Sequence, residues 1–100
     1  MRDAWIYAGN ETARECFRGL ADWSVEVISK LSDTDMETVL GWEHGGMNEV
    51  IADAFCLFGD MKYLDAAKRY SHKYEINGMQ GNPYNAHFLD NQHANTQVPK

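Results

Sequence analysis

Apolar residues at helical spacing dominate the first third of the chain. They recur in steps of three and four residues with charged residues between them, which predicts one long amphipathic helix over 11–31. Asn10 fits the N-cap of this helix, and Gly9 fits the end of a preceding helix over 2–8. The apolar stripe comprises Ala13, Cys16, Phe17, Leu20, Val27, Ile28 and Leu31.

Further helices follow from capping residues and from a second apolar run. Thr34 and Glu37 fit a capping box for a short helix that Gly41 ends. From 47 to 58 nine of the twelve residues are apolar, so we expect this helix to be the most buried. An amphipathic helix over 61–73 comes next. Residues 77–95 are rich in Asn, Gly and Pro and predict a long loop.

The pattern repeats at an offset of 50 residues. The segment Ala8-Gly9-Asn10 aligns with Phe58-Gly59-Asp60, and the stripes that follow stay in register. Each repeat is an apolar inner helix, a tight Gly turn and an amphipathic outer helix. Such pairs build all-α solenoids or closed α/α toroids. We therefore expect about two helical hairpins, forming one fragment of a single toroid domain over 1–100 with no internal boundary.

Composition limits the possible functions. The chain has 100 residues with 9 basic and 15 acidic side chains, a net charge of −6, which argues against binding nucleic acid. The longest apolar stretch is interrupted by Asp53, so no membrane span is expected, and no apolar leader follows Arg2. Cys16 and Cys56 fall within helical apolar patterns and are expected to be buried free thiols. They do not identify a compartment, and the localisation stays open.

One candidate site precedes the second apolar helix. Glu43 and His44 come just before two glycines at a predicted helix N-terminus, where free backbone N–H groups can meet a ligand. Trp42 beside them could stack on a sugar face. The alternative is that these residues only cap the helix and make a turn. Glu49 and Asp53 carry like charges at i and i+4, which favours a polar cavity or an internal ion pair.

A second candidate lies in the segment 91–97. His93, Asn95 and Gln97 offer neutral donors and acceptors, as polyhydroxylated ligands require, although an ordinary polar loop would look similar. His93 lies 49 residues after His44, so both could face one toroid mouth. Glu43 and the two histidines lack the close spacing of a zinc site. His72 is expected to be exposed, and Trp5, Tyr7 and Trp23 are expected in the core.

Three motifs in this order resemble glycoside hydrolase family 127, the β-L-arabinofuranosidase type: EHGGMNEV at 43–50, GDMKYLDAAKRYSHK at 59–73 and HANTQVPK at 93–100. The resemblance covers nearly the whole chain and implies part of an (α/α)6 barrel in a longer enzyme that removes L-arabinofuranosyl or related groups with retention. It also implies a zinc-bound cysteine nucleophile and a glutamate acid/base outside this stretch. Neither Cys16 nor Cys56 matches that cysteine.

The resemblance carries over residue by residue only in part. His44 and His93 match histidines that line the sugar subsite, so we expect substrate contacts from His44, His93, Glu43, Asn95 and Gln97, with no catalytic or metal-binding residue in this stretch. The chain alone is expected to be inactive, and either to self-associate or to be marginally stable. Two alternatives stay open: a toroid epimerase or lyase with His44 and His93 as bases, and a non-enzymatic helical binding module.

Overall fold

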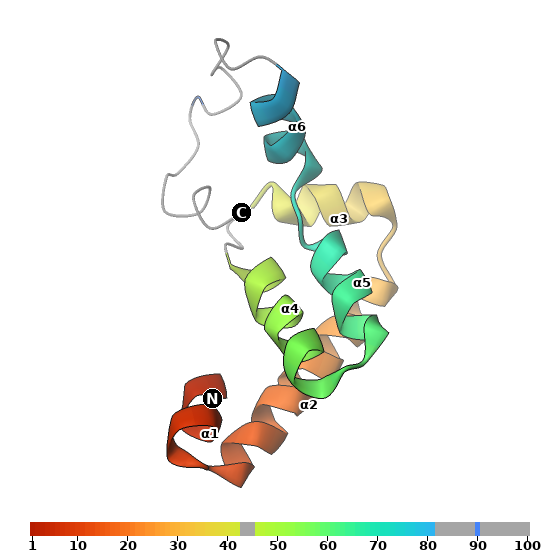
Figure 1. The fold of residues 1–100 in the computed structure, drawn as a ribbon. Coiled ribbons are helices and arrows are strands. Elements are labelled where there is room, and N and C mark those ends of the chain that lie inside the picture. The colour runs from red at the N-terminus through yellow and green to blue at the C-terminus, as the bar shows by residue number, and fades with distance from the viewer. Residues whose placement is uncertain (43–45, 82–89, 91–100) are drawn as a thin grey trace.

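The computed structural model describes residues 1–42, 46–81 and 90 (Figure 1). These residues form six α-helices and no strand, which confirms the all-α prediction for the described part of the chain. No helix among the described residues is long and apolar enough to cross a membrane. The helices are α1 (Arg2–Ala8), α2 (Glu11–Ser29), α3 (Asp33–Leu40), α4 (Met47–Phe58), α5 (Met61–Arg69) and α6 (Lys73–Gly81).

Two antiparallel helical hairpins, α1–α2 and α4–α5, make up most of the fold (Figure 1). Both turn at a glycine in the left-handed region, Gly9 with φ 63° and Gly59 with φ 73°. In each hairpin the next residue caps the outer helix: the side chains of Asn10 and Asp60 each accept a first-turn amide hydrogen at 3.0 Å. The repeat at an offset of 50 residues is therefore a structural repeat, because the same turn chemistry recurs at the same place.

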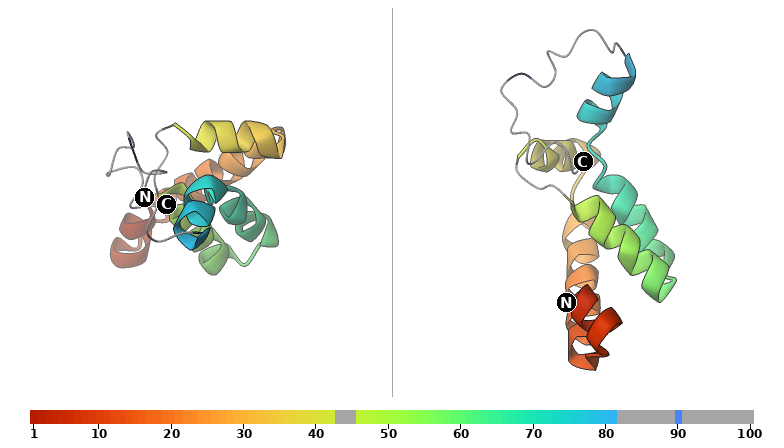
Figure 2. Two further views of the ribbon diagram at one scale, coloured as in Figure 1. Left: turned by 90° about the horizontal axis from the view of Figure 1, so that it is seen from above. Right: turned by 60° about the vertical axis from the view of Figure 1, so that its left-hand side comes forward.

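The core lies where the hairpins meet. α4 and α5 run side by side in both views of Figure 2, and α2 crosses them. The Ser24 hydroxyl and the Tyr70 hydroxyl form a buried hydrogen bond of 2.7 Å between α2 and α5. At the turn end, Phe58 packs with three aromatic rings at centroid distances of 5.6 to 6.0 Å; these rings belong to Trp5, Phe17 and Tyr63.

The buried face of α2 is rotated from the predicted stripe. Its buried residues are Phe17, Ala21, Ser24 and Ile28, whereas Leu20 and Val27 are 51% and 40% exposed. Ser24 can occupy a core position because its hydroxyl is hydrogen-bonded to Tyr70. The rotation leaves Cys16 exposed, and Cys56 is exposed as well, so the prediction of buried thiols is wrong. It also leaves Trp23 exposed, and Tyr7 at the end of α1 is exposed too, so the prediction that these two residues lie in the core is wrong. Trp5 is half-buried.

Several predicted helix boundaries are wrong. The capping box of α3 is Ser32 with Asp35 rather than Thr34 with Glu37: the Ser32 hydroxyl accepts from the Asp35 amide at 3.1 Å. Glu37 instead reaches across to α6, where its carboxylate accepts the amides of Lys73 and Tyr74 at 3.3 and 3.4 Å. Residues 73–81 form α6, although the sequence predicted a loop from 77, because a carboxylate from another helix caps this weak helix former. The predicted outer helices end earlier than expected, at Ser29 and Arg69.

The prediction that α4 is the most buried helix is also wrong. Only Ile51 and Ala54 are buried in its 12 residues, whereas Tyr63, Ala66 and Ala67 are buried in the 9 residues of α5. A helix that is apolar on nearly every side needs neighbours on every side. Among the described residues, α4 is covered mainly by α5 and α2, so its remaining apolar side chains stay partly exposed.

Candidate functional site

The residues predicted to contact substrate lie outside the described part of the chain. These are Glu43, His44, His93, Asn95 and Gln97; His87 also lies there. The structure does describe the residues on both sides of the first motif. α3 ends at Leu40. The amide of Gly41, which follows, donates to the Glu37 carbonyl oxygen at 3.0 Å, and the Trp42 side chain is 75% exposed.

On the other side of the motif, α4 begins directly after Gly46. Gly46 has φ 81°, a conformation that favours glycine, and its carbonyl oxygen accepts the Val50 amide at 3.2 Å. Gly46 has no side chain that could cap the helix, and within the first turn the Asn48 side-chain oxygen accepts the Glu49 amide at 2.9 Å. The EHGG motif therefore leads directly into the N-terminus of α4, where the sequence predicted that a helix begins.

A cavity of about 350 Å³ lies at this N-terminus, between the start of α1 and the first turn of α4. Arg2 reaches across it to form an ion pair with Asp53, and its Nε donates to the Asp3 carboxylate at 3.0 Å. The hydrogen bond to Asp3 is the main reason that the pKa of Arg2 is raised. The cavity is lined by Arg2, Asp3, Gly46, Met47, Glu49 and Val50.

One of the two like charges on α4, Asp53, has a partner of opposite charge. Asp53 is paired with Arg2, but their side chains are 33% and 37% exposed, so the ion pair is half-buried and not internal as predicted. Glu49 lies one turn nearer Gly46 and borders the cavity. The side chains offer carboxylate acceptors and guanidinium donors, which can bind ligand hydroxyl groups. The described residues contain no group of three or more His, Cys, Asp or Glu side chains placed to hold a metal ion.

The family model for the β-L-arabinofuranosidase GH127 catalytic domain matches residues 1–100. The chain belongs to this glycoside hydrolase family. A search of curated proteins found no significant match. The two hairpins agree with the GH127 catalytic domain, which is an α/α barrel, so the fold that the resemblance implied is confirmed.

One feature of the GH127 chain was missed by reading the sequence. His72 was expected to be exposed, but it is 5% exposed and lies between two carboxylates, with Nε2 3.8 Å from Glu37 and Nδ1 3.9 Å from Glu75. Glu75 is 2% exposed, and neither of its carboxylate oxygens has a hydrogen-bond partner among the residues that the structure describes. The i, i+3 spacing of His72 and Glu75 could have indicated the pair, but contact with Glu37 depends on how α3 and α6 pack.

Proposed function

We propose that this GH127 chain supplies sugar-binding residues to an enzyme that removes L-arabinofuranosyl or related groups from plant-type glycans with retention. The observation that carries the proposal is the charged cavity at the N-terminus of α4, which borders Gly46 of the EHGG motif. A furanose presents several hydroxyl groups within a few ångströms, and carboxylate, guanidinium and imidazole groups can all hydrogen-bond to them.

In this proposal each residue positions the sugar rather than reacting with it. Arg2 is fixed from two sides by Asp3 and Asp53, so it can donate to a hydroxyl group with little further loss of side-chain freedom. Glu49 accepts from a second hydroxyl. His44 and His93, with Glu43, Asn95 and Gln97 nearby, orient the ring so that the anomeric carbon faces the nucleophile.

The reactive groups are proposed to come from elsewhere in the catalytic domain. Retention requires a nucleophile and an acid/base group on either side of the glycosidic bond, and we assign neither to this chain. The zinc that the family resemblance implies would be bound outside this stretch and would hold the attacking cysteine as a thiolate. The chain by itself is therefore expected to release no sugar.

The test uses a full-length enzyme that contains this chain and an aryl β-L-arabinofuranoside. We expect His44→Ala and His93→Ala each to lower kcat/KM by roughly 100-fold or more, because a misplaced substrate loses its oriented attack. Glu49→Gln should mainly raise KM. Glu26→Gln is the matched control, since Glu26 is exposed and pairs with Lys30 one turn along α2.

Product analysis separates the proposal from its alternatives. Free L-arabinose with the anomeric configuration of the substrate is the expected product, followed by NMR at early times. An epimerised or unsaturated sugar would instead support a toroid epimerase or lyase. Unchanged kinetics in both histidine variants, with unchanged thermal unfolding, would show that this chain does not contribute the sugar subsite.

A further inference from the structure

The two short connecting helices, α3 and α6, lie at the end of the molecule where sugar binding is proposed. α3 follows the outer helix α2 and leads to the EHGG motif, and α6 follows the outer helix α5 and precedes the segment 91–97. In Figure 1 both lie beyond the start of α4, at the end of the α4–α5 hairpin opposite the turn at Gly59. Each of them comes directly before one of the two sugar motifs, so α3 and α6 form part of the rim around the proposed site.

A cavity of about 480 Å³ lies between these two helices, and we call it the α3–α6 cavity. The Glu37 carboxylate connects its two sides, because it accepts the amides of Lys73 and Tyr74 at 3.3 and 3.4 Å. The buried His72 ring borders the cavity as well, with Nε2 3.8 Å from the Glu37 carboxylate. These contacts fix the two sides relative to each other. The lining residues are Thr34, Glu37, Thr38, Gly41, His72 and Tyr74.

The lining offers hydrogen-bonding groups without a permanent positive charge. The Thr38 hydroxyl donates to the Thr34 carbonyl oxygen at 3.0 Å, so the Thr38 oxygen can still accept a hydrogen bond, and the Thr34 hydroxyl can donate or accept. Glu37 adds a carboxylate, and none of the lining residues that the structure describes is a lysine or an arginine. A phosphate or an acidic sugar would meet this carboxylate without a cation opposite it. The α3–α6 cavity therefore suits a neutral ligand that carries several hydroxyl groups.

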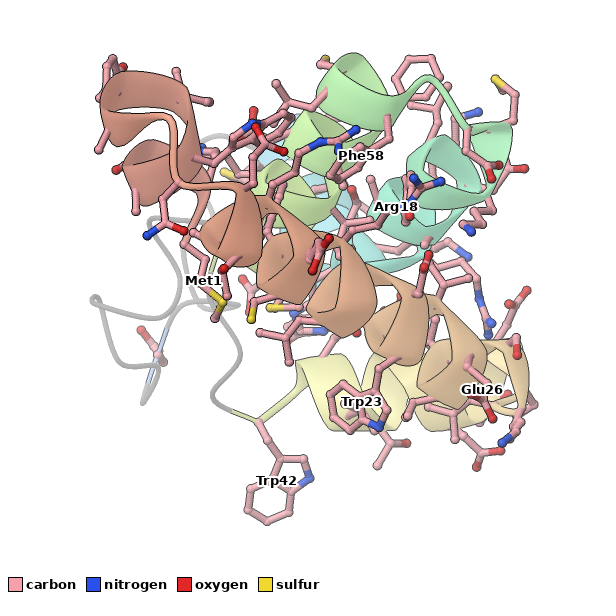
Figure 3. All side chains as sticks on the ribbon, turned by 90° about the horizontal axis from the view of Figure 1, so that it is seen from below. Met1, Arg18, Trp23, Glu26, Trp42 and Phe58 are labelled. Atoms are coloured by element: carbon pink, nitrogen blue, oxygen red, sulfur yellow. The ribbon has the colours of Figure 1, made fainter. Side chains whose placement is uncertain are left out.

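Two exposed aromatic side chains accompany these polar groups. Tyr74 lines the cavity and is 56% exposed, with its ring centroid 6.0 Å from that of His72. Trp42 follows Gly41, and Figure 3 shows its side chain projecting away from the helices at the end of α3. An exposed aromatic ring offers a flat apolar face on which the C–H groups of a sugar can pack. Aromatic faces beside a few hydroxyl groups are the combination that a sugar ring requires.

One glycan can reach both this cavity and the one at the start of α4. Gly41 borders the α3–α6 cavity and Gly46 borders the other, and five residues of chain span at most about 18 Å. We propose that the α3–α6 cavity is a second carbohydrate subsite, which binds the neutral glycan on the leaving-group side of the bond that is cleaved. This inference rests on the proposed function and adds to it the recognition of a substrate longer than one sugar.

The test compares a short and a long ligand in a full-length enzyme that contains this chain. Methyl 1-thio-β-L-arabinofuranoside ends at the bond to be cleaved, whereas a neutral L-arabinofuranosyl trisaccharide with thioglycosidic linkages extends beyond it, and neither is hydrolysed. Isothermal titration calorimetry gives Kd for each. We expect Tyr74→Ala to raise the Kd of the trisaccharide by about 5- to 10-fold and Thr38→Val by about 3- to 10-fold. The Kd of the methyl thioglycoside should stay unchanged in both variants.

Two control variants carry comparable substitutions away from the cavity. Trp23→Ala removes an aromatic ring that is exposed to an extent similar to that of Tyr74, and Thr12→Val removes an exposed hydroxyl; both residues lie on α2. Both controls should leave the Kd of both ligands unchanged. Tyr74 and Thr38 are themselves exposed, so the cavity variants should keep their fold, and an unchanged Kd of the methyl thioglycoside verifies this in the same sample.

The results separate this subsite from the proposed function. An equal trisaccharide Kd in the parent and in both cavity variants would overturn the subsite alone. So would binding of the methyl thioglycoside without binding of the trisaccharide, or a parallel rise in Kd for both ligands, since that rise would place Tyr74 and Thr38 at the first sugar. Binding of neither ligand, together with no release of L-arabinose, would refute the proposed function and the subsite with it.

Discussion

The hydrogen bond between Ser24 and Tyr70 allows a quantitative test of how the two hairpins are joined. Its oxygen–oxygen distance is 2.7 Å, and the two residues are 3% and 9% exposed. The bond links α2 to α5 across 46 positions in sequence, so it forms only when the hairpins pack as described. Tyr70→Phe removes one partner with little change in shape.

The expected cost follows from the burial of the partners. A net contribution of about 1 kcal/mol is typical of such a bond, and a buried group left unpaired costs about 1 to 3 kcal/mol. Tyr70→Phe should therefore lower stability by about 1 kcal/mol, and Ser24→Ala by somewhat more, because the phenolic hydroxyl loses its partner. In a domain of this size 1 kcal/mol corresponds to about 4 to 8 °C in Tm.

A double-mutant cycle separates the bond from general packing. Thermal and urea unfolding of the two single variants and of the double variant should give a coupling energy of about 1 kcal/mol, because the double variant leaves no orphaned hydroxyl. Tyr7→Phe is the control: Tyr7 is 85% exposed, and its loss of a hydroxyl should leave Tm unchanged. Additive effects in the cycle would refute the packing of α2 on α5 described above.

Three further predictions address the turns, the acid response and the association of the chain. Gly59→Ala should lower the free energy of unfolding by about 1 to 2 kcal/mol, because φ is 73° at this residue. Gly19→Ala should raise it by about 0.5 to 1 kcal/mol, because Gly19 lies within α2 and Ala is the better helix former. Thermal unfolding measures both. The pKa of Asp22 is lowered by hydrogen bonds from Tyr63 and Lys62. The Asp22 carboxylate should therefore contribute fully to folding stability above about pH 4, and this contribution should fall as the pH drops through the lowered pKa. Urea unfolding at a series of pH values should show a smaller loss of stability in acid for Asp22→Asn. Sedimentation velocity should show weak, concentration-dependent self-association of the chain, because large apolar side chains such as Leu20 and Trp23 are exposed. A strictly monomeric chain at all concentrations would contradict this.

Local signals in the sequence were sufficient for most of the helices. The left-handed Gly turns and the side-chain caps at Asn10 and Asp60 depend on neighbouring residues only, and they were predicted correctly at both hairpins. The pairing of Asp53 was also predictable, because two like charges on an apolar helix need a counter-charge. The residues predicted to bind sugar belong to motifs that were readable in the sequence, but those residues lie outside the described part of the chain.

Contacts between helices that are distant in sequence determined the features that the sequence did not predict. Reading the sequence missed α6 and the buried His72, because both depend on Glu37, which reaches them from α3. It also placed Cys16 and Leu20 in the core, since apolar periodicity shows that a helix has an apolar face but not which part of that face a neighbour covers.

The sequence by itself therefore determined the first five helices, the repeat and the family, because turn chemistry, hydrophobic period and short motifs are properties of nearby residues. Only the tertiary structure decided which apolar surfaces are buried and which carboxylates meet which cations. Those outcomes depend on the angle and register at which helices pack. A rotation of α2 by a fraction of a turn exchanged Leu20 for Ser24 in the core, and the hydrogen bond to Tyr70 explains why the polar residue occupies the buried position.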